Sequence, residues 1–466
     1  MQKTFYIHTF GCQMNEHDSA RMGESLTRAG WIPTAAPESA DLVLLNTCAI
    51  REKAEDKLYS ALGRYRLLKS ARGARIGVAG CVAQQEKEAL LARAPYVDFV
   101  LGPDQLARVS DLAEQGGIET GWVPSEEYVF PQADPETSRG RVTAFVLAMK
   151  GCDNVCSFCV VPHTRGREVS RPYAEIVREV HALVGVGVRE VTLIGQNVNS
   201  YAGGCSFAAL IRRVAAVPGL ARIRFTTSHP MDLSGELVEC FRDVPQLMPH
   251  FHLPVQHGSD AVLARMRRRY SIAEYEARVG SLLEACPHVA LTSDIICGFP
   301  GETEAEHAQT LALLRRVPYD NLFSFLYSER PHTAASLKLE KERAAAVKDP
   351  AWTEVPREIA LRRLDEVQSL QFARTLARHR EAVGGEVEVL VESARTPAGA
   401  PGERFGRSRQ NWTVHFQGDC AAADIVRVRV SRASMAALSG VQAGVSDPAP
   451  FVADKAPRTR LAVLSG

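Results

Sequence analysis

The sequence predicts an α/β protein with three folded parts: an N-terminal open parallel-sheet domain, a central partial (β/α)6 barrel and a small C-terminal antiparallel β-barrel. Strand-like runs alternate with helical stretches over residues 1–125. Six further strand–helix repeats follow within residues 139–378, and short strands separated by Gly, Pro and Asp turns fill residues 381–437. A chain of 466 residues also exceeds what one hydrophobic core usually supports, so several domains are expected.

The composition is that of an ordinary soluble protein, with 45% hydrophobic and 23% charged residues. No apolar run approaches the roughly 20 residues that a membrane span needs, and no secretory leader precedes the first strand. We therefore expect a cytoplasmic protein without membrane contact, acting as a monomer. The net charge of +1 gives no overall attraction for nucleic acid, so any RNA binding must come from local patches.

Three buried-type strands of the N-terminal domain are each followed closely by a cysteine. The runs FYIHTF, LVLLNT and RIGVAG precede Cys12, Cys48 and Cys81. Strand ends of a parallel sheet lie along one edge, where ligands bind, so these three thiols can converge although they are far apart in sequence. A single such cysteine is as easily a buried structural residue. Three at the same topological position instead predict a three-thiolate site.

The central domain begins after a proline-rich connection, with FVLAMK as its first strand. Five more strand candidates follow: EVTLIG, RIRFTTS, HFHLPV, VALTSDII and NLFSFLY. Polar residues come after several of them, as expected for an active site at the C-terminal ends of barrel strands. Arg265 and the run Arg267–Arg269 are expected to form a solvated helix face, with RNA contact as the second possibility.

The first strand of this barrel leads into the loop KGCDNVCSFCV, which places Cys152, Cys156 and Cys159 within eight residues. A structural zinc site needs four protein ligands, and this loop offers three before the chain moves away. Three cysteines can instead hold a four-iron cluster with one iron open to substrate or cofactor. Unrelated free cysteines seldom cluster so tightly. The spacing therefore favours a reactive iron–sulfur centre.

The C-terminal barrel carries a local excess of arginines with Phe405 and Trp412 between them, a pattern suited to RNA. The arginines are Arg404, Arg407, Arg409, Arg427, Arg429 and Arg432. Residues 442–466 are rich in Ala, Pro and Ser and are expected to be disordered. Residues 338–358, between the barrel and the long helix that follows it, are expected to be a surface insertion.

The cysteine loop resembles the signature of the radical S-adenosylmethionine (SAM) superfamily, and the run GCDNVCSFCVVPHTRGREVSRP resembles its methylthiotransferases. GCQMN and NTCAIREKAEDK are similar to the branch that modifies tRNA, the tRNA-2-methylthio-N6-dimethylallyladenosine synthases. The resemblance implies two [4Fe-4S] clusters: one on Cys152, Cys156 and Cys159 that binds SAM, and an auxiliary one on Cys12, Cys48 and Cys81. It also assigns six residues to SAM binding: Phe158, Gln196, Asn197, Ser228, Gln256 and Gly298.

The implied reaction inserts sulfur and a methyl group at C2 of N6-dimethylallyladenosine at tRNA position 37, beside the anticodon. A radical made from SAM would abstract the hydrogen at C2, the auxiliary cluster would hold the sulfur, and a second SAM would give the methyl group. The C-terminal barrel resembles the TRAM domain, an RNA-binding module. An electron donor and a sulfur source are further implied partners.

The sequence leaves alternative functions open. A sister methylthiotransferase acting on threonylcarbamoyladenosine or on a ribosomal protein would share both cysteine sets. A non-catalytic iron–sulfur protein, either an electron carrier or an RNA binder, would hold a cluster without cleaving SAM. A structural zinc protein that binds RNA would contain zinc and no iron.

Overall fold

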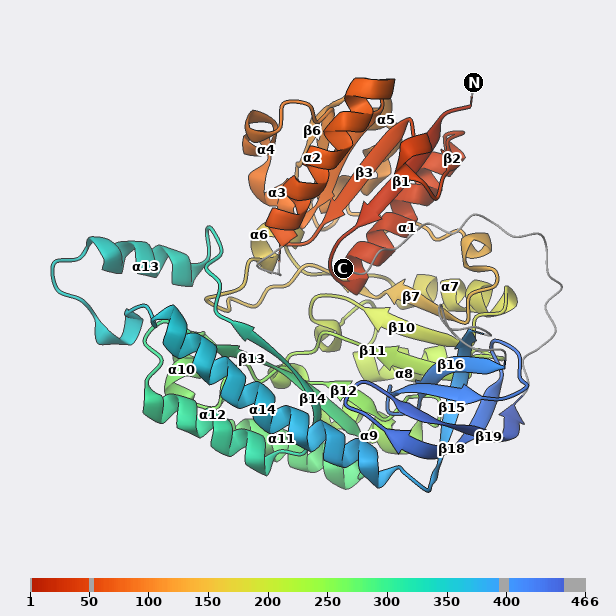
Figure 1. The fold of residues 1–466 in the computed structure, drawn as a ribbon, viewed down its shortest axis with the longest axis vertical. Helices are drawn as coiled ribbons and strands as arrows, with labels where there is room; N and C mark the ends of the chain where they lie inside the picture. Colours follow the sequence, from red (N-terminus) through yellow and green to blue (C-terminus); the bar gives the residue numbers. More distant parts are fainter. Residues whose placement is uncertain (1, 50–53, 394–401, 448–466) are drawn as a thin grey trace.

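The computed structural model describes residues 2–49, 54–393 and 402–447, which form the three predicted parts (Figure 1). The N-terminal domain lies above the central barrel in this view, and the C-terminal barrel packs against the lower right of the central one. None of the helices in the described part of the chain combines the length and apolar character that a bilayer crossing requires.

The N-terminal domain is built on a six-stranded sheet in which every pair of neighbouring strands is parallel. Its strands, in spatial order, are β2 (Ile32–Pro33), β1 (Thr4–Thr9), β3 (Leu42–Thr47), β4 (Arg75–Gly80), β5 (Phe99–Leu101) and β6 (Gly117–Glu119). The central strands are buried on both faces, which is why they read as unbroken apolar runs in the sequence. The predicted parallel sheet is confirmed.

Helices cover both faces of this sheet, and each face has its own core. On one side, Phe5 and Ile7 of β1 pack with residues of α1 (Gln13–Arg28) and α5 (Val109–Gln115). On the other side, Tyr6 packs with residues of the remaining helices. These are α2 (Ala54–Arg72), α3 (Cys81–Glu86) and α4 (Glu88–Arg93). Alternate side chains of each strand thus supply opposite cores.

The central domain has six parallel strands in two three-stranded sheets. The strands are β7 (Thr143–Leu147), β10 (Glu190–Ile194), β11 (Arg222–Phe225), β12 (His250–His252), β13 (Ala290–Cys297) and β14 (Tyr319–Leu326). The two sheets meet where Ile223 of β11 forms a parallel bridge with Leu247, just before β12. Because the strands follow one another in chain order around a curved wall, the predicted partial (β/α)6 barrel is confirmed.

One outer face of this wall is covered by helices that bury a large shared core. They are α7 (Tyr173–Gly185), α8 (Phe207–Ala215), α9 (Gly235–Asp243), α11 (Ile272–Ala285), α12 (Glu304–Arg316) and α14 (Arg357–Glu381), with the short α10 (Asp260–Arg265) beside them. Local sequence fixes where several begin. Ser271 and Glu274 form a capping box at α11, and Thr303 and Glu306 form another at α12.

The C-terminal domain is a closed five-stranded barrel. Its strands, in spatial order, are β15 (Glu386–Ser393), β16 (Glu403–Ser408), β17 (Thr413–Gln417), β19 (Leu438–Asp447) and β18 (Ile425–Ala433). The prediction of a tail from residue 442 was wrong for residues 442–447, because β19 closes the barrel by pairing with β17 and β18. The β17–β19 pair is parallel, whereas the other pairs are antiparallel. Residues 448–466 of the predicted tail lie outside the described residues.

Two buried arginines of β11 attach the C-terminal barrel to the central one. Arg222 donates to the carbonyl of Arg407 at 2.9 Å and to Glu388 at 3.0 Å. Arg224 donates to the carbonyls of Ser408 and Arg409 at 2.7 and 3.0 Å, and to Glu190 at 3.0 Å. Backbone carbonyls at the β16–β17 turn are thereby satisfied by side chains from the other domain.

The predicted insertion at 338–358 contains most of α13 (Ala334–Ala344), which projects from the body of the molecule (Figure 1). It returns to the barrel at Gly301, whose N–H donates to the carbonyl of Thr353 at 2.8 Å. The start of α13 contacts the cysteine loop, since Ala335 N–H donates to the carbonyl of Ser157 at 2.8 Å.

We expect Arg224→Met to lower the free energy of unfolding by about 3 kcal/mol, since it removes one partner from a buried ionic and hydrogen-bonded set. Urea unfolding followed by circular dichroism measures the change. Arg427→Met is the control, because the Arg427 side chain is 59% exposed and its contact with Glu386 is a long 3.8 Å. Equal unfolding midpoints for the two variants would contradict the docking role.

Candidate iron–sulfur sites at the strand ends

The three N-terminal cysteines follow three adjacent strands of the sheet. Cys12 is the N-cap of α1 after β1, Cys48 follows β3, and Cys81 is the first residue of α3 after β4. The left-handed Gly11 (φ +115°) passes so close to Cys48 that a Cβ on it would lie 2.3 Å from the Cys48 Cβ. The structure thus places these cysteines at the same edge of the sheet, as the strand order requires.

Cys12 and Cys48 are hydrogen-bonded through their side chains, and this bond lowers the pKa of the Cys12 thiol to about 6. Burial acts in the opposite direction, and the nearby Arg165 guanidinium adds to the lowering. A thiolate is the form of cysteine that binds metal, so this environment favours ligation.

Arg165 reaches this edge from the central domain, on the short helix α6 (Val161–Arg165) that follows the second set of cysteines. Its side chain is buried, and its Nε donates to Cys81 Sγ at 3.2 Å. The same guanidinium donates to Asn15 Oδ1 at 3.0 Å and pairs with Asp18 at 2.6 Å, both on α1. One cation therefore ties the Cys81 strand end to the helix that Cys12 caps.

The loop that carries Cys152, Cys156 and Cys159 runs between β8 (Met149–Lys150) and α6. Cys152 N–H donates to the carbonyl of Gly166 at 3.2 Å, and Cys159 N–H donates to the carbonyl of Cys156 at 3.2 Å. The loop is also held by hydrogen bonds to the C-terminal end of α10. Ser157 donates through its N–H to the carbonyl of Met266 at 3.0 Å and through its hydroxyl to that of Arg265 at 2.8 Å.

Arg268 has the same role at this loop as Arg165 has at the first cysteine set: its buried guanidinium donates to a cysteine sulfur. It is 8% exposed and donates to Cys156 Sγ at 3.5 Å, to the carbonyl of Pro254 at 2.8 Å and to the Tyr270 hydroxyl at 2.9 Å. The expectation that Arg265 and Arg267–Arg269 form a solvated helix face is therefore wrong for Arg268. It is also wrong about the helix, because α10 ends at Arg265 and the run lies in the turn after it. Deep burial raises the pKa of Cys159 to about 12, so an unliganded Cys159 stays a thiol.

Three of the predicted SAM-binding residues lie at the ends of β10 and β11. The Gln196 side chain accepts a hydrogen bond from Gly151 N–H at 2.5 Å, beside the cysteine loop. Asn197 donates to Asp232 at 2.8 Å. Asn197 Oδ1 and Ser228 Oγ are buried and find no hydrogen-bond partner among the described residues. Buried polar atoms without partners cost free energy, which a polar ligand at this rim would recover.

The other three residues are held differently. Gln256 has a left-handed backbone (φ +75°), a conformation that is uncommon away from glycine and recurs at functional sites. Gly298 donates its N–H to Glu302 at 2.5 Å, and a Cβ on it would lie 2.6 Å from that of Ala360 on α14. Phe158 packs in an apolar cluster with Met266 and its neighbours. Contact of these residues with SAM stays a prediction.

The donor sets fit iron–sulfur clusters chemically. Each set offers three cysteine sulfurs, and in each a buried guanidinium donates to one of them. Hydrogen bonds to cluster sulfurs are a known means of tuning iron–sulfur centres. Within the described ranges, no three Cys, His, Asp or Glu side chains lie close enough to chelate a single metal ion. A four-iron cluster spreads its cysteines over different iron atoms and does not need that geometry.

Gly151 gives a direct test of the loop geometry. Its φ is +73°, and a Cβ would lie 1.9 Å from the carbonyl oxygen of Arg167. We expect Gly151→Ala to lose the iron held by this loop after reconstitution, measured as iron and sulfide per chain in a background with Cys12, Cys48 and Cys81 replaced by alanine. Gly140→Ala is the matched control, because Gly140 has φ +78° but open space around it. Equal iron in the two variants would contradict the assigned geometry.

Two family models and a solved structure match parts of the chain. The model of "Uncharacterized protein family UPF0004" matches residues 4–102, and that of the Radical SAM superfamily matches residues 146–314. The solved structure of the radical S-adenosylmethionine methyltransferase TsrM from Kitasatospora setae, with cobalamin and a [4Fe-4S] cluster, superposes with a TM-score of 0.55. The match covers 75% of this chain and 80% of that one at 14% identity, which shows a shared fold.

Relatives in sequence are much closer. A tRNA-2-methylthio-N(6)-dimethylallyladenosine synthase of Anaeromyxobacter sp. (strain K) is 60% identical over 449 residues, covering 94% of each chain. The enzyme of that name from Myxococcus xanthus is 56% identical over 453 residues, covering 96% of this chain and 95% of its own. The chain therefore belongs to the family of tRNA-2-methylthio-N(6)-dimethylallyladenosine synthases, within the radical SAM superfamily.

Proposed function

We propose that the chain attaches sulfur and a methyl group to C2 of N6-dimethylallyladenosine beside the anticodon of tRNA, using two [4Fe-4S] clusters. Family membership supports the reaction class and the use of SAM with one cluster. The observation that carries the second cluster is the meeting of Cys12, Cys48 and Cys81 at the ends of three adjacent strands, with Arg165 on Cys81.

When bound, the clusters and SAM supply the hydrogen-atom abstraction at C2, the sulfur and the methyl group. The chain's own residues hold and orient these groups. Cys152, Cys156 and Cys159 would hold one cluster, and Arg268 offsets buried negative charge beside Cys156. Asn197 Oδ1 and Ser228 Oγ, which have no hydrogen-bond partner in the described part of the chain, would accept hydrogen bonds from SAM at the rim.

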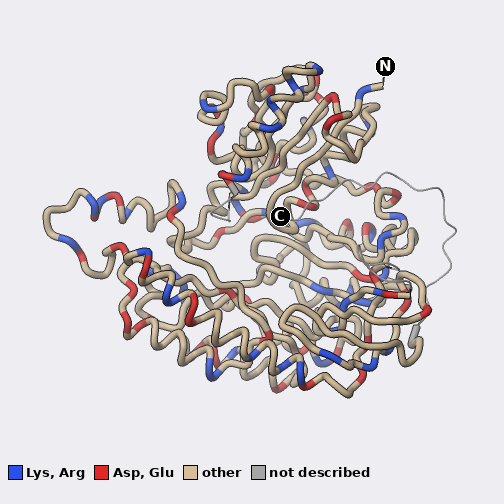
Figure 2. The backbone as a smooth tube through the Cα atoms, in the orientation of Figure 1, with Lys and Arg blue, Asp and Glu red and all other residues tan. Residues whose placement is uncertain are grey.

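Recognition of RNA must be local, because Lys and Arg alternate with Asp and Glu over all three domains (Figure 2). On the C-terminal barrel, the side chains of Arg427 and Arg429 are 59% and 63% exposed, which suits contact with phosphates. Trp412 is less suited to stack on a base than the sequence suggested, because its ring packs against the His379 ring of α14. The two ring centres are 5.3 Å apart. An external electron donor and a sulfur source, a monomeric state and a cytoplasmic location complete the proposal.

We expect Cys152→Ala and Cys12→Ala each to abolish 2-methylthio-N6-dimethylallyladenosine, because each removes a ligand of one cluster. Mass spectrometry of nucleosides from a tRNA digest measures the product in a deletion strain that expresses each variant. Cys286→Ala is the control, since Cys286 caps the C-terminus of α11 just before the start of β13 and belongs to neither set. Wild-type product with either ligand variant would refute the role of that site.

Two further measurements separate the alternatives. Reconstituted protein should hold about eight iron atoms per chain if both clusters form, against about four for a single cluster. Prenylated and threonylcarbamoylated anticodon stem-loops, offered in parallel, should show modification of the prenylated one. Modification of the threonylcarbamoylated substrate alone would assign the chain to the sister activity.

A further inference from the structure

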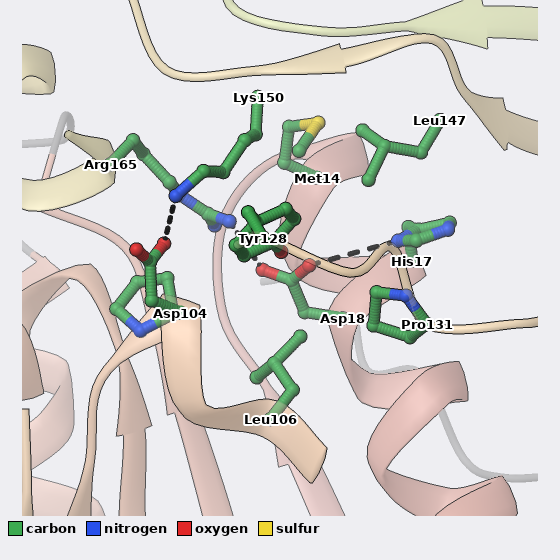
Figure 3. Close-up of a pocket in the computed structure, with 11 residues that line it drawn as sticks. Met14, His17, Asp18, Asp104, Leu106, Tyr128, Pro131, Leu147, Lys150 and Arg165 are labelled. Carbon is green, nitrogen blue, oxygen red and sulfur yellow. Dashed lines mark hydrogen bonds and ion pairs between the residues drawn. The ribbon is translucent and has the colours of Figure 1, made fainter. Parts of the chain in front are cut away.

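Two buried ion pairs join the ends of the cysteine loop to the N-terminal domain (Figure 3). Before the first cysteine of the loop, Lys150 Nζ pairs with Asp104 at 2.6 Å, with side chains 7% and 1% exposed. After the last, Arg165 pairs with Asp18 at 2.6 Å, with side chains 7% and 4% exposed. The three sulfur ligands are thus bracketed by two cations whose partners belong to the other domain.

The surroundings of these pairs are largely apolar. Figure 3 shows Met14, Leu106, Tyr128 and Leu147 around them. Lys150 Nζ also lies 4.0 Å from the centre of the Tyr128 ring, in a cation–π contact. Charges in such a setting are little screened by salt, and each strongly requires its partner.

Buried ion pairs add little net stability compared with well-packed apolar groups, but they penalise every arrangement in which a charge is left alone. Each of these pairs therefore favours one placement of the loop over its neighbours. Arg165 strengthens this preference for one placement of the loop. Its guanidinium binds both Cys81 and α1, the helix that Cys12 caps and that carries Asp18.

We infer that the pairs Lys150–Asp104 and Arg165–Asp18 form a two-point clamp that sets the distance between the radical-generating cluster and the auxiliary cluster. The clamp residues are positioning residues, since they lie beside the cluster ligands. This inference rests on the proposed function. Its consequence is that loosening the clamp separates two activities. SAM cleavage needs only the centre of the central domain, whereas sulfur insertion needs both centres at the correct distance.

Asp18→Asn and Asp104→Asn test the clamp, because they remove its anions without altering the loop or any cysteine. We expect both variants to keep SAM cleavage, measured as 5′-deoxyadenosine, while methylthiolated product falls by about 100-fold, as for a displacement of about 1 Å. We also expect weaker magnetic coupling between the two reduced clusters in the EPR spectrum, since dipolar coupling decreases with the cube of the distance.

Asp111→Asn is the matched control. Asp111 lies in the same domain as Asp18 and Asp104 and pairs at 3.7 Å with Arg108, but the two side chains are 58% and 48% exposed, so the pair is weak. The swap Lys150→Asp with Asp104→Lys restores an ion pair of opposite polarity and should recover coupling and product. Should Asp104→Asn lose iron, recovery of iron in the swap supports the clamp, and continued loss overturns it.

The clamp is also overturned if both clamp variants, Asp18→Asn and Asp104→Asn, retain the wild-type coupling and product ratio, or if Asp111→Asn changes them equally. The EPR measurement needs no tRNA. A wild-type enzyme that shows coupled clusters but leaves a prenylated stem-loop unmodified would therefore refute the proposed substrate while leaving the clamp intact.

Discussion

Burial of negatively charged sulfur is the constraint on which this structure depends. A thiolate taken out of water needs a compensating charge or hydrogen bond. Each cysteine set has one, in Arg165 for Cys81 and Arg268 for Cys156. Neither arginine follows the strand end that it serves, so the charge balance of each site exists only after separate elements have packed together.

The same chemistry joins the three domains. Guanidinium groups of Arg222 and Arg224 satisfy carbonyls of the C-terminal barrel, while Arg165 satisfies acceptors of the N-terminal domain. Planar donors with several N–H groups suit such contacts, because one side chain can fix both position and orientation. The central barrel thus contacts its neighbours through buried polar groups as well as through apolar clusters, such as Met14 with Leu147 and Val142 with Leu390.

Sequence reasoning succeeded where the signal was local. The strands, the cysteines that follow them and the barrel repeats can each be recognised from a few consecutive residues. The burial of Arg268 was missed because the sequence predicts a solvated helix there, whereas α10 ends at Arg265 and the chain after it turns Arg268 inward. Lys150 and Asp104 are 46 residues apart, so no periodicity links them. The strand β19 was missed because its sequence, LSGVQAGVSD, is rich in small and polar residues and depends on its barrel partners for order.

The short helix after the cysteine loop belongs by sequence to the central barrel, yet Val160 at its N-cap is 4% exposed within the core of the N-terminal sheet domain. The domain to which this helix belongs by chain order is therefore not the domain against which Val160 packs. An N-terminal fragment that ended at the proline-rich connection would expose the apolar surface that Val160 covers. It would also leave Asp18 without Arg165. Chimaeras between relatives should exchange the segment around Val160 together with the N-terminal domain, because evolution of the two parts is constrained to proceed jointly.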